Sequence, residues 1–162
     1  MNKQEILNEI NKTKEHLANM EKMLEECDYE RWKPKEDENY WYIDDKFELH
    51  NAKFTNSLYD DNKIETYNCF QTKEEAEQEA EKILIRRQLE DIAKRLNKGE
   101  KFDWKRNQSK WYLFWDWNYE EIRSYECFNF QGGEVYCLDG NFKDVAIREI
   151  GEEKLKNYLR GE

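Results

Sequence analysis

The stretch TKEEAEQEAEKILIRRQLEDIAKRLNKG, residues 72–99, has the start signal, the apolar spacing and the stop signal of one long amphipathic helix. Thr72 followed three residues later by Glu75 is a capping-box pattern, in which each side chain accepts a hydrogen bond from a backbone amide at the helix start. Gly99 is the stop signal. The apolar residues between these signals recur at helical spacing and predict one buried face: Ala76, Ala80, Ile83, Leu84, Leu89, Ile92, Ala93 and Leu96.

The segments on either side of this helix resemble each other. Trp111-Tyr112-Leu113 repeats Trp41-Tyr42-Ile43 at an offset of 70 residues. Alternating apolar and polar residues predict three strands in each segment. A final helix is expected from a cap at Asn141 toward Leu159, kinked or broken at Gly151. The expected strands cover residues 40–43, 47–54 and 64–70 in the first segment, and residues 110–117, 122–130 and 134–138 in the second.

These patterns predict an α+β fold built from two duplicated β-β-β-α modules with antiparallel sheet, at residues 40–99 and 100–162. Each module has one amphipathic helix to cover one face of a small sheet. The two modules can either share a continuous sheet or pack back to back, and both arrangements fit the pattern. Turns are expected at 44–45, 60–62 and 132–133.

A coiled-coil-like helix is predicted at residues 1–27, followed by a charged linker at residues 28–39 that holds the only proline, Pro34. Apolar residues alternate at spacings of three and four, which is the heptad pattern of a helix that pairs with another helix. Two interpretations remain open, a dimerisation arm and a helix that lies on its own domain. The residues expected to mediate oligomerisation are Ile6, Ile10, Leu17, Met20 and Leu24.

The charge balance restricts the class of partner. The formal net charge is -10, and residues 28–72 hold 11 acidic and 6 basic side chains. Such a surface repels a phosphate backbone, so direct nucleic-acid binding is not expected. It suits a basic partner surface, including one that normally holds nucleic acid, although the same charge also serves simple solubility.

The sequence contains no recognisable catalytic or cofactor motif. Four cysteines lack C-x-x-C spacing and there are only two histidines, so neither a zinc site nor any other metal site is expected. No phosphate-binding glycine loop and no nucleophile elbow are present. We therefore expect a protein that is not an enzyme and needs no cofactor. The absence of a signal peptide and of a long apolar run predicts a cytoplasmic protein that does not enter a membrane.

The aromatic run KWYLFWDW, residues 110–117, carries apolar side chains on both faces of the expected strand, so two faces need to be covered. On a strand, Tyr112 and Phe114 point away from the side that carries Leu113 and the neighbouring tryptophans. Together with Tyr119 these rings need either a cover or a partner, because large exposed apolar patches are rare on monomers. A base-stacking platform is disfavoured because basic residues do not flank the run in the sequence.

Four stretches resemble a widespread group of proteins from phages and prophages of Firmicutes. They are RWKPKEDENYWYI (31–43), NCFQTKEEAE (68–77), LNKGEKFDW (96–104) and YCLDGNFKDVAIREIGEEKL (136–155), and the resemblance covers most of the chain. Small acidic phage proteins of this kind are often accessory factors, and some of similar size are inhibitors of host defence such as anti-CRISPR proteins. The resemblance therefore implies an accessory or anti-defence role in the host cytoplasm.

The function expected from these observations is non-catalytic inhibition of a bacterial defence protein or ribonucleoprotein that has a basic surface. Acidic side chains would mimic phosphates and aromatic side chains would anchor the contact. The alternatives are a structural protein that forms a homodimer through its first helix, and a protein that sequesters a small ligand. The residues expected to contact the partner are Asp44, Asp45, Asp60, Asp61, Tyr112, Phe114 and Tyr119.

Overall fold

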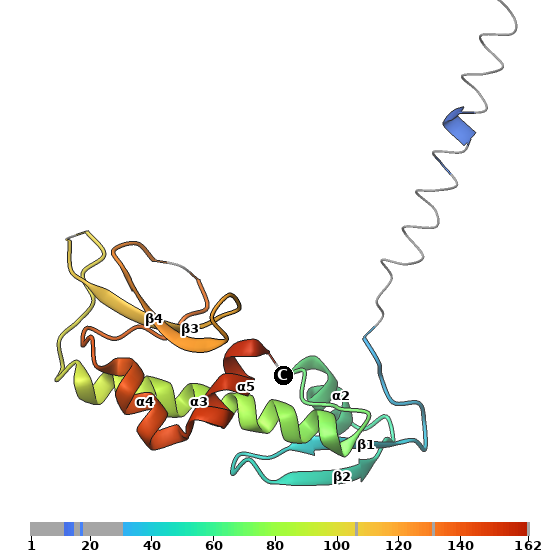
Figure 1. Ribbon diagram of the computed structural model, residues 1–162. Helices are drawn as coiled ribbons and strands as arrows, with labels where there is room; N and C mark the ends of the chain where they lie inside the picture. The colour runs from blue at the N-terminus through green and yellow to red at the C-terminus, as the bar shows by residue number, and fades with distance from the viewer. Residues whose placement is uncertain (1–11, 15–16, 18–30, 106, 131, 162) are drawn as a thin grey trace, which may run out of the picture. The chain divides into compact units, whose positions relative to one another are not determined.

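The computed structural model describes residues 12–14, 17, 31–105, 107–130 and 132–161 (Figure 1). The chain separates into two units, residues 1–33 and 34–162, and every element described below belongs to the second unit. Of the predicted oligomerisation residues only Leu17 is described, and it is exposed. Ile6, Ile10, Met20 and Leu24 lie outside the described residues, so the helical arm stays a prediction.

The second unit alternates small antiparallel hairpins with helices, which confirms the α+β class. Its two sheets have two strands each, with β1 paired to β2 and β3 paired to β4. In chain order the elements are β1 (Asn39–Ile43), β2 (Leu49–Lys53), α2 (Leu58–Glu65), α3 (Lys73–Leu96), β3 (Lys110–Asp116), β4 (Glu121–Cys127), α4 (Phe142–Ile150) and α5 (Glu152–Arg160).

Helix α3 is the long helix that the sequence predicts, and it contacts both parts of the unit (Figure 1). Its capping box is formed, with the Thr72 side chain accepting from the Glu75 amide and the Glu75 carboxylate accepting from the Thr72 amide. The predicted face is shifted at one point, because Leu84 is exposed and Ile85 is buried in its place. Ile85 joins the core shared with β3, β4, α4 and α5.

The first hairpin is held against a third segment by a single antiparallel bridge. Trp41 and Phe70 exchange two backbone hydrogen bonds of 2.9 Å each. The Asn68 side chain extends this pairing, donating to the Ile43 carbonyl at 2.6 Å and accepting from the Ile43 amide at 2.8 Å. The predicted strand at residues 64–70 is therefore wrong, since its first residues complete α2 and the rest form only the bridge.

The second hairpin has the same kind of attachment. Trp111 and Cys137 exchange backbone hydrogen bonds of 2.7 and 2.8 Å, and the predicted strand at residues 134–138 is reduced to this bridge. The two three-stranded modules are thus not found in the described part of the chain. Helix α2 also has no helical counterpart among the described residues between β4 and α4, so the two segments are not equivalent.

The larger core lies where α3, α4 and α5 meet the β3–β4 hairpin. Phe142 and Leu155 are fully buried there beside Ile92 of α3. Gly151 separates α4 from α5 with a φ of 96°, which a residue with a side chain adopts only under strain, so the predicted break is confirmed. Asn141 occupies the cap position of α4 without a side-chain cap hydrogen bond.

Asp60 is the buried polar centre of the first part of the unit, with 3% of its surface exposed. The predicted turn at residues 60–62 is wrong, because Ser57 and Asp60 form a capping box that starts α2. One carboxylate oxygen accepts from the Tyr40 hydroxyl at 2.8 Å, and the other accepts from the amide and hydroxyl of Thr55, both at 2.9 Å. Burial opposes ionisation, but these hydrogen bonds outweigh it and lower the pKa of Asp60.

We predict that Asp60→Asn lowers the free energy of unfolding by about 2–3 kcal/mol, because an amide nitrogen would face donors that now bond to a carboxylate. The pKa of Asp60 is lower in the folded state than in the unfolded state. Ionised Asp60 therefore stabilises the fold fully above the pKa of the unfolded state, and this stabilisation is lost as pH falls through the pKa of the folded state. The difference in the free energy of unfolding between Asp60→Asn and the unmodified protein should therefore become smaller below about pH 4. Denaturant titration at pH 7 and pH 3 measures it.

The matched control is Asp61→Asn, because Asp61 is the exposed neighbour in the same helical turn. It should cost under about 1 kcal/mol, the size of a surface charge near a helix start. Equal losses for the two variants would contradict the structural role of Asp60.

Candidate functional site

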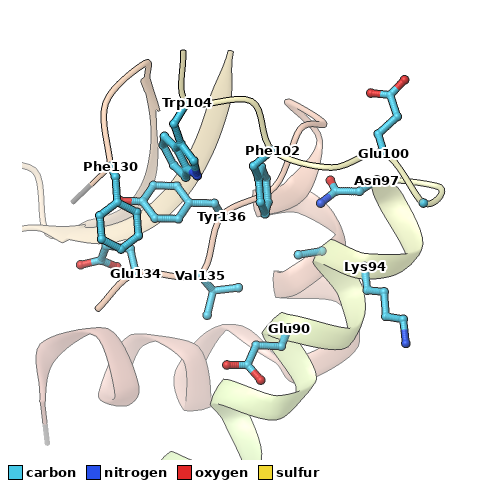
Figure 2. Close-up of a pocket in the computed structure, with 12 residues that line it drawn as sticks. Glu90, Lys94, Asn97, Glu100, Phe102, Trp104, Phe130, Glu134, Val135 and Tyr136 are labelled. Atoms are coloured by element: carbon cyan, nitrogen blue, oxygen red, sulfur yellow. The ribbon is translucent and has the colours of Figure 1, made fainter. Parts of the chain in front are cut away.

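A pocket of about 430 Å³ lies beside the C-terminal half of α3. One wall is the helix itself, with Glu90, Lys94 and Asn97. The facing wall is aromatic and comes from two loops around the β3–β4 hairpin (Figure 2). Its four rings are Phe102, Trp104, Phe130 and Tyr136, and we call this set the aromatic wall.

Three ring pairs of the aromatic wall meet nearly at right angles, whereas Phe102–Trp104 and Phe130–Tyr136 are tilted at 36° and 40°. The Trp104 ring centroid lies 5.1 Å from that of Tyr136 at an interplanar angle of 79°, and 5.4 Å from that of Phe130 at 83°. Phe102 meets Tyr136 at 73°. Edge-to-face contacts of this kind are favourable beyond the apolar area that they bury. Tyr136 is buried and anchors the group, whereas Phe130 is 67% exposed and forms its rim.

A buried lysine fixes the loop that carries Trp104. Lys110 opens β3, is fully buried, and donates from Nζ to the carbonyls of Asp103 at 2.9 Å and Gln108 at 2.7 Å. The same nitrogen lies 4.6 Å from the Trp104 ring centroid, within the range of a cation–π contact. The Gln108 side chain also accepts from the Asp103 amide at 2.8 Å. These bonds hold Trp104 in place before any ligand arrives.

Asn97 fixes the segment that carries Tyr136. It is buried at the C-terminal end of α3, and its Oδ1 accepts from the Leu138 amide at 2.7 Å and the Cys137 thiol at 3.3 Å. Nearer the N-terminus of α3, Arg86 donates to the Gly133 carbonyl at 3.2 Å. Both ends of residues 133–138 are thus tied to α3.

The pocket is acidic, because three carboxylates and one ammonium line it: Glu90, Glu100, Glu134 and Lys94. Figure 2 shows Glu134 beside the Phe130 ring, whereas the side chains of Lys94 and Glu100 extend away from the aromatic wall. Burial raises the pKa of Glu134, and nearby Arg86 partly opposes that shift. Glu134 is exposed, so its carboxylate can be reached from solvent, and a carboxylate next to aromatic rings favours a positively charged ligand.

The four acids expected to bind a partner do not gather at one place. Asp60 is buried and bonded as described above, so it is not available to a partner in this fold. Asp44 accepts from the Glu48 amide at 2.9 Å and from His50 at 3.0 Å, and these contacts lower its pKa. Asp45, in the turn after β1, and Asp61, in α2, are exposed.

The three predicted aromatic residues have different surroundings. Tyr112 is half-buried behind the aromatic wall, with its ring centroid 5.9 Å from that of Tyr136 and 6.2 Å from that of Phe114. Tyr119 is exposed and carries the Arg123 guanidinium 4.3 Å from its ring centroid. Only Tyr112 is thus connected to the pocket, as support for one of its rings.

One premise of the sequence argument is corrected by the fold, because basic side chains do reach the aromatic strand. Arg160 of α5 lies 5.6 Å from the Trp115 ring centroid and 5.5 Å from that of Trp117. Arg123 is paired with Asp116 at 3.1 Å and Glu121 at 2.8 Å, so much of its charge is compensated. Arg160 is distant in sequence and Arg123 is brought in by strand pairing opposite Phe114, so inspection of the run alone does not reveal these cations.

In the part of the chain that the structure describes, one group of side chains has the spacing of a metal site. Ligand atoms of Asp44, Glu48 and His50 lie within 4.8 Å of one another. Because Asp44 already bonds to His50 and to two turn amides, an ordinary hairpin turn explains the cluster. Sequence reasoning missed the pocket residues Trp104, Phe130 and Glu134, because it placed Phe130 and Glu134 in expected strands, whereas β4 ends at Cys127 and both residues lie in the loop that follows.

Comparison with protein-family models, curated proteins and solved structures found no match to this chain. Among the described residues, no helix has the length and apolar character needed to cross a membrane. The functional argument therefore depends on the geometry and charge of the pocket.

We predict that Asn97→Ala lowers the free energy of unfolding by about 1–3 kcal/mol, because the Leu138 amide would lose its partner in a buried place. The aromatic wall should also loosen, which near-ultraviolet circular dichroism would record as a weaker aromatic signal. The control is Asn107→Ala at an exposed position. An Asn97→Ala protein as stable as that control would contradict the proposed attachment of residues 137–138 to α3.

Proposed function

We propose that this chain is a non-catalytic binding protein whose partner is a macromolecule with a basic surface, and that the acidic, aromatic pocket is the centre of the contact. The observation that carries the proposal is the packed aromatic wall beside the Glu134 carboxylate. Preformed aromatic anchors lose little side-chain entropy on binding, which is why such residues dominate binding energy at interfaces.

The pocket chemistry supports binding over catalysis. Glu134 has a raised pKa, which is one property of a general acid. Catalysis would need a second group that acts on the same atom, and Glu134 lies beside the rim ring Phe130 with the Lys94 side chain directed elsewhere. Recognition of a cationic side chain uses the same carboxylate and the same rings without a reacting partner.

The overall charge supports a basic partner. A net charge of -10 accelerates association with a positive surface and makes it sensitive to salt. Exposed acids such as Asp45 and Asp61 would add to this attraction without being part of the pocket. The resemblance to phage accessory proteins favours a cytoplasmic, nucleic-acid-handling defence complex as the partner, and that identity is part of the proposal.

The test is quantitative affinity capture from lysate of the cells in which the chain is naturally made, with two matched variants. Phe130→Ser removes the rim of the pocket, and Trp117→Ser removes an equally exposed ring, since both residues are 67% exposed. We expect a partner that is retained by the unmodified protein and by Trp117→Ser, is depleted at least tenfold with Phe130→Ser, and dissociates at high salt.

Two results would contradict the proposal. The first is a partner whose recovery depends on Trp117 and not on Phe130, which would move the contact to the other aromatic surface. The second is a partner that remains bound to Phe130→Ser at high salt. This result would show that neither the pocket nor the charge of the chain is needed for binding.

A further inference from the structure

The aromatic wall has a shape that selects among cations. We propose that the pocket binds an alkylammonium group, as found at the end of a lysine side chain and in its N-methylated forms. The inference deepens the proposed function, because the basic partner would supply this group. It identifies the chemical class of the ligand, which the acidity of the pocket alone does not.

The argument starts from ring geometry. Trp104 is nearly perpendicular to both Phe130 and Tyr136, at 83° and 79°, while Phe130 and Tyr136 are tilted only 40° from each other, so these two rings form one side of a corner and Trp104 the other. A flat guanidinium is best held between parallel faces, where it stacks on the rings and bonds in its own plane. A rounded ammonium or trimethylammonium group presents the same charge in every direction and can contact several faces of a corner at once.

The charges at the pocket favour the same group. Glu134 lies beside the rim ring Phe130, and Glu90 lies on the helix wall opposite (Figure 2). Glu90 is already paired with Arg86 at 3.2 Å, so Glu134 carries most of the attraction for a ligand cation. Glu134 is exposed but partly desolvated, which raises its pKa, and a bound cation would offset that desolvation. Lys110 already places an ammonium near Trp104 and opposes a second cation there, so the attraction for a ligand cation comes from Glu134 at the rim beside Phe130.

The size of the pocket is adequate for a whole side chain. A volume of about 430 Å³ lies within the range of small-ligand sites, about 300–1,000 Å³. Ala93 and Val135 provide apolar lining for the methylene chain, while the charged end reaches the rings. The site thus resembles the environment that a long amphipathic side chain prefers, apolar along the stem and polar at its tip.

The experiment is a titration of the full chain, monitored by NMR at the indole N–H of Trp104, which is assigned by its absence in Trp104→Phe. Four capped amino acids serve as probes: lysine, Nε-trimethyl-lysine, arginine and the neutral isostere of trimethyl-lysine in which carbon replaces the charged nitrogen. We expect trimethyl-lysine to bind most tightly and lysine next. The isostere should be about tenfold weaker than trimethyl-lysine, as expected for cation–π recognition of about 1.4 kcal/mol, and arginine should be several-fold weaker.

Variants separate the pocket from the rest of the surface. Glu134→Gln and Phe130→Ser should each weaken the binding of trimethyl-lysine severalfold, and Trp117→Ser should leave it unchanged. Equal affinities for trimethyl-lysine and its neutral isostere would overturn the inference, and so would arginine binding as tightly as trimethyl-lysine. Absence of any shift at Trp104 with all four probes would overturn it as well.

The outcome is distinguishable from failure of the proposed function. If the probes fail while Phe130→Ser still abolishes capture of a partner, the pocket contacts that partner through other chemistry, so only the inference falls. If the probes bind as expected while Phe130→Ser leaves capture unchanged, the ammonium site stands and the partner contact lies elsewhere.

Discussion

The structure depends on one constraint, that a two-stranded hairpin has too little apolar surface to be stable alone. Both hairpins of this unit are stabilised in the same way, by attachment to another segment of the chain. The first tryptophan of each hairpin, Trp41 or Trp111, forms one antiparallel bridge to a segment that leads to the next helix. Helix α3 contacts the first hairpin and provides Ile85, Leu89 and Ile92 to the core under the second. The helix is long because it packs against both hairpins.

The pocket is a consequence of this attachment. The bridge from Trp111 places Cys137 next to Asn97, and the Asn97 side chain then holds Leu138. Tyr136 is therefore fixed against Trp104, whose loop is held by the buried Lys110. The aromatic wall is thus positioned by backbone bonds and by two buried polar side chains. A preformed site of this kind binds without the cost of ordering its own walls.

The sequence predicted the parts of the fold that local patterns encode. The capping box at Thr72, the four strands of the two hairpins and the break at Gly151 all follow from short-range spacing. The third strand of the first segment was predicted wrongly because a capping box at Ser57 and Asp60 starts a helix where acidic residues suggested a turn. The third strand of the second segment is reduced to the one bridge between Trp111 and Cys137. The pocket was missed because Trp104 lies in the loop before β3 whereas Phe130 and Glu134 lie in the loop after β4, and only long-range contacts bring the two loops together. Burial of Asp60 was hidden for the same reason, since Tyr40 is its distant partner.

The central claim is that the bridge between Trp111 and Cys137 preforms the pocket. Native-state hydrogen exchange of the full chain tests this claim most directly. The relevant amides are those of Trp111, Cys137 and Leu138, which donate to Cys137, Trp111 and Asn97 respectively. The account predicts that all three exchange as slowly as the most protected amides of α3, through global unfolding. Fast exchange at Cys137 and Leu138 while α3 stays protected would show that the aromatic wall detaches independently, and it would contradict a preformed site.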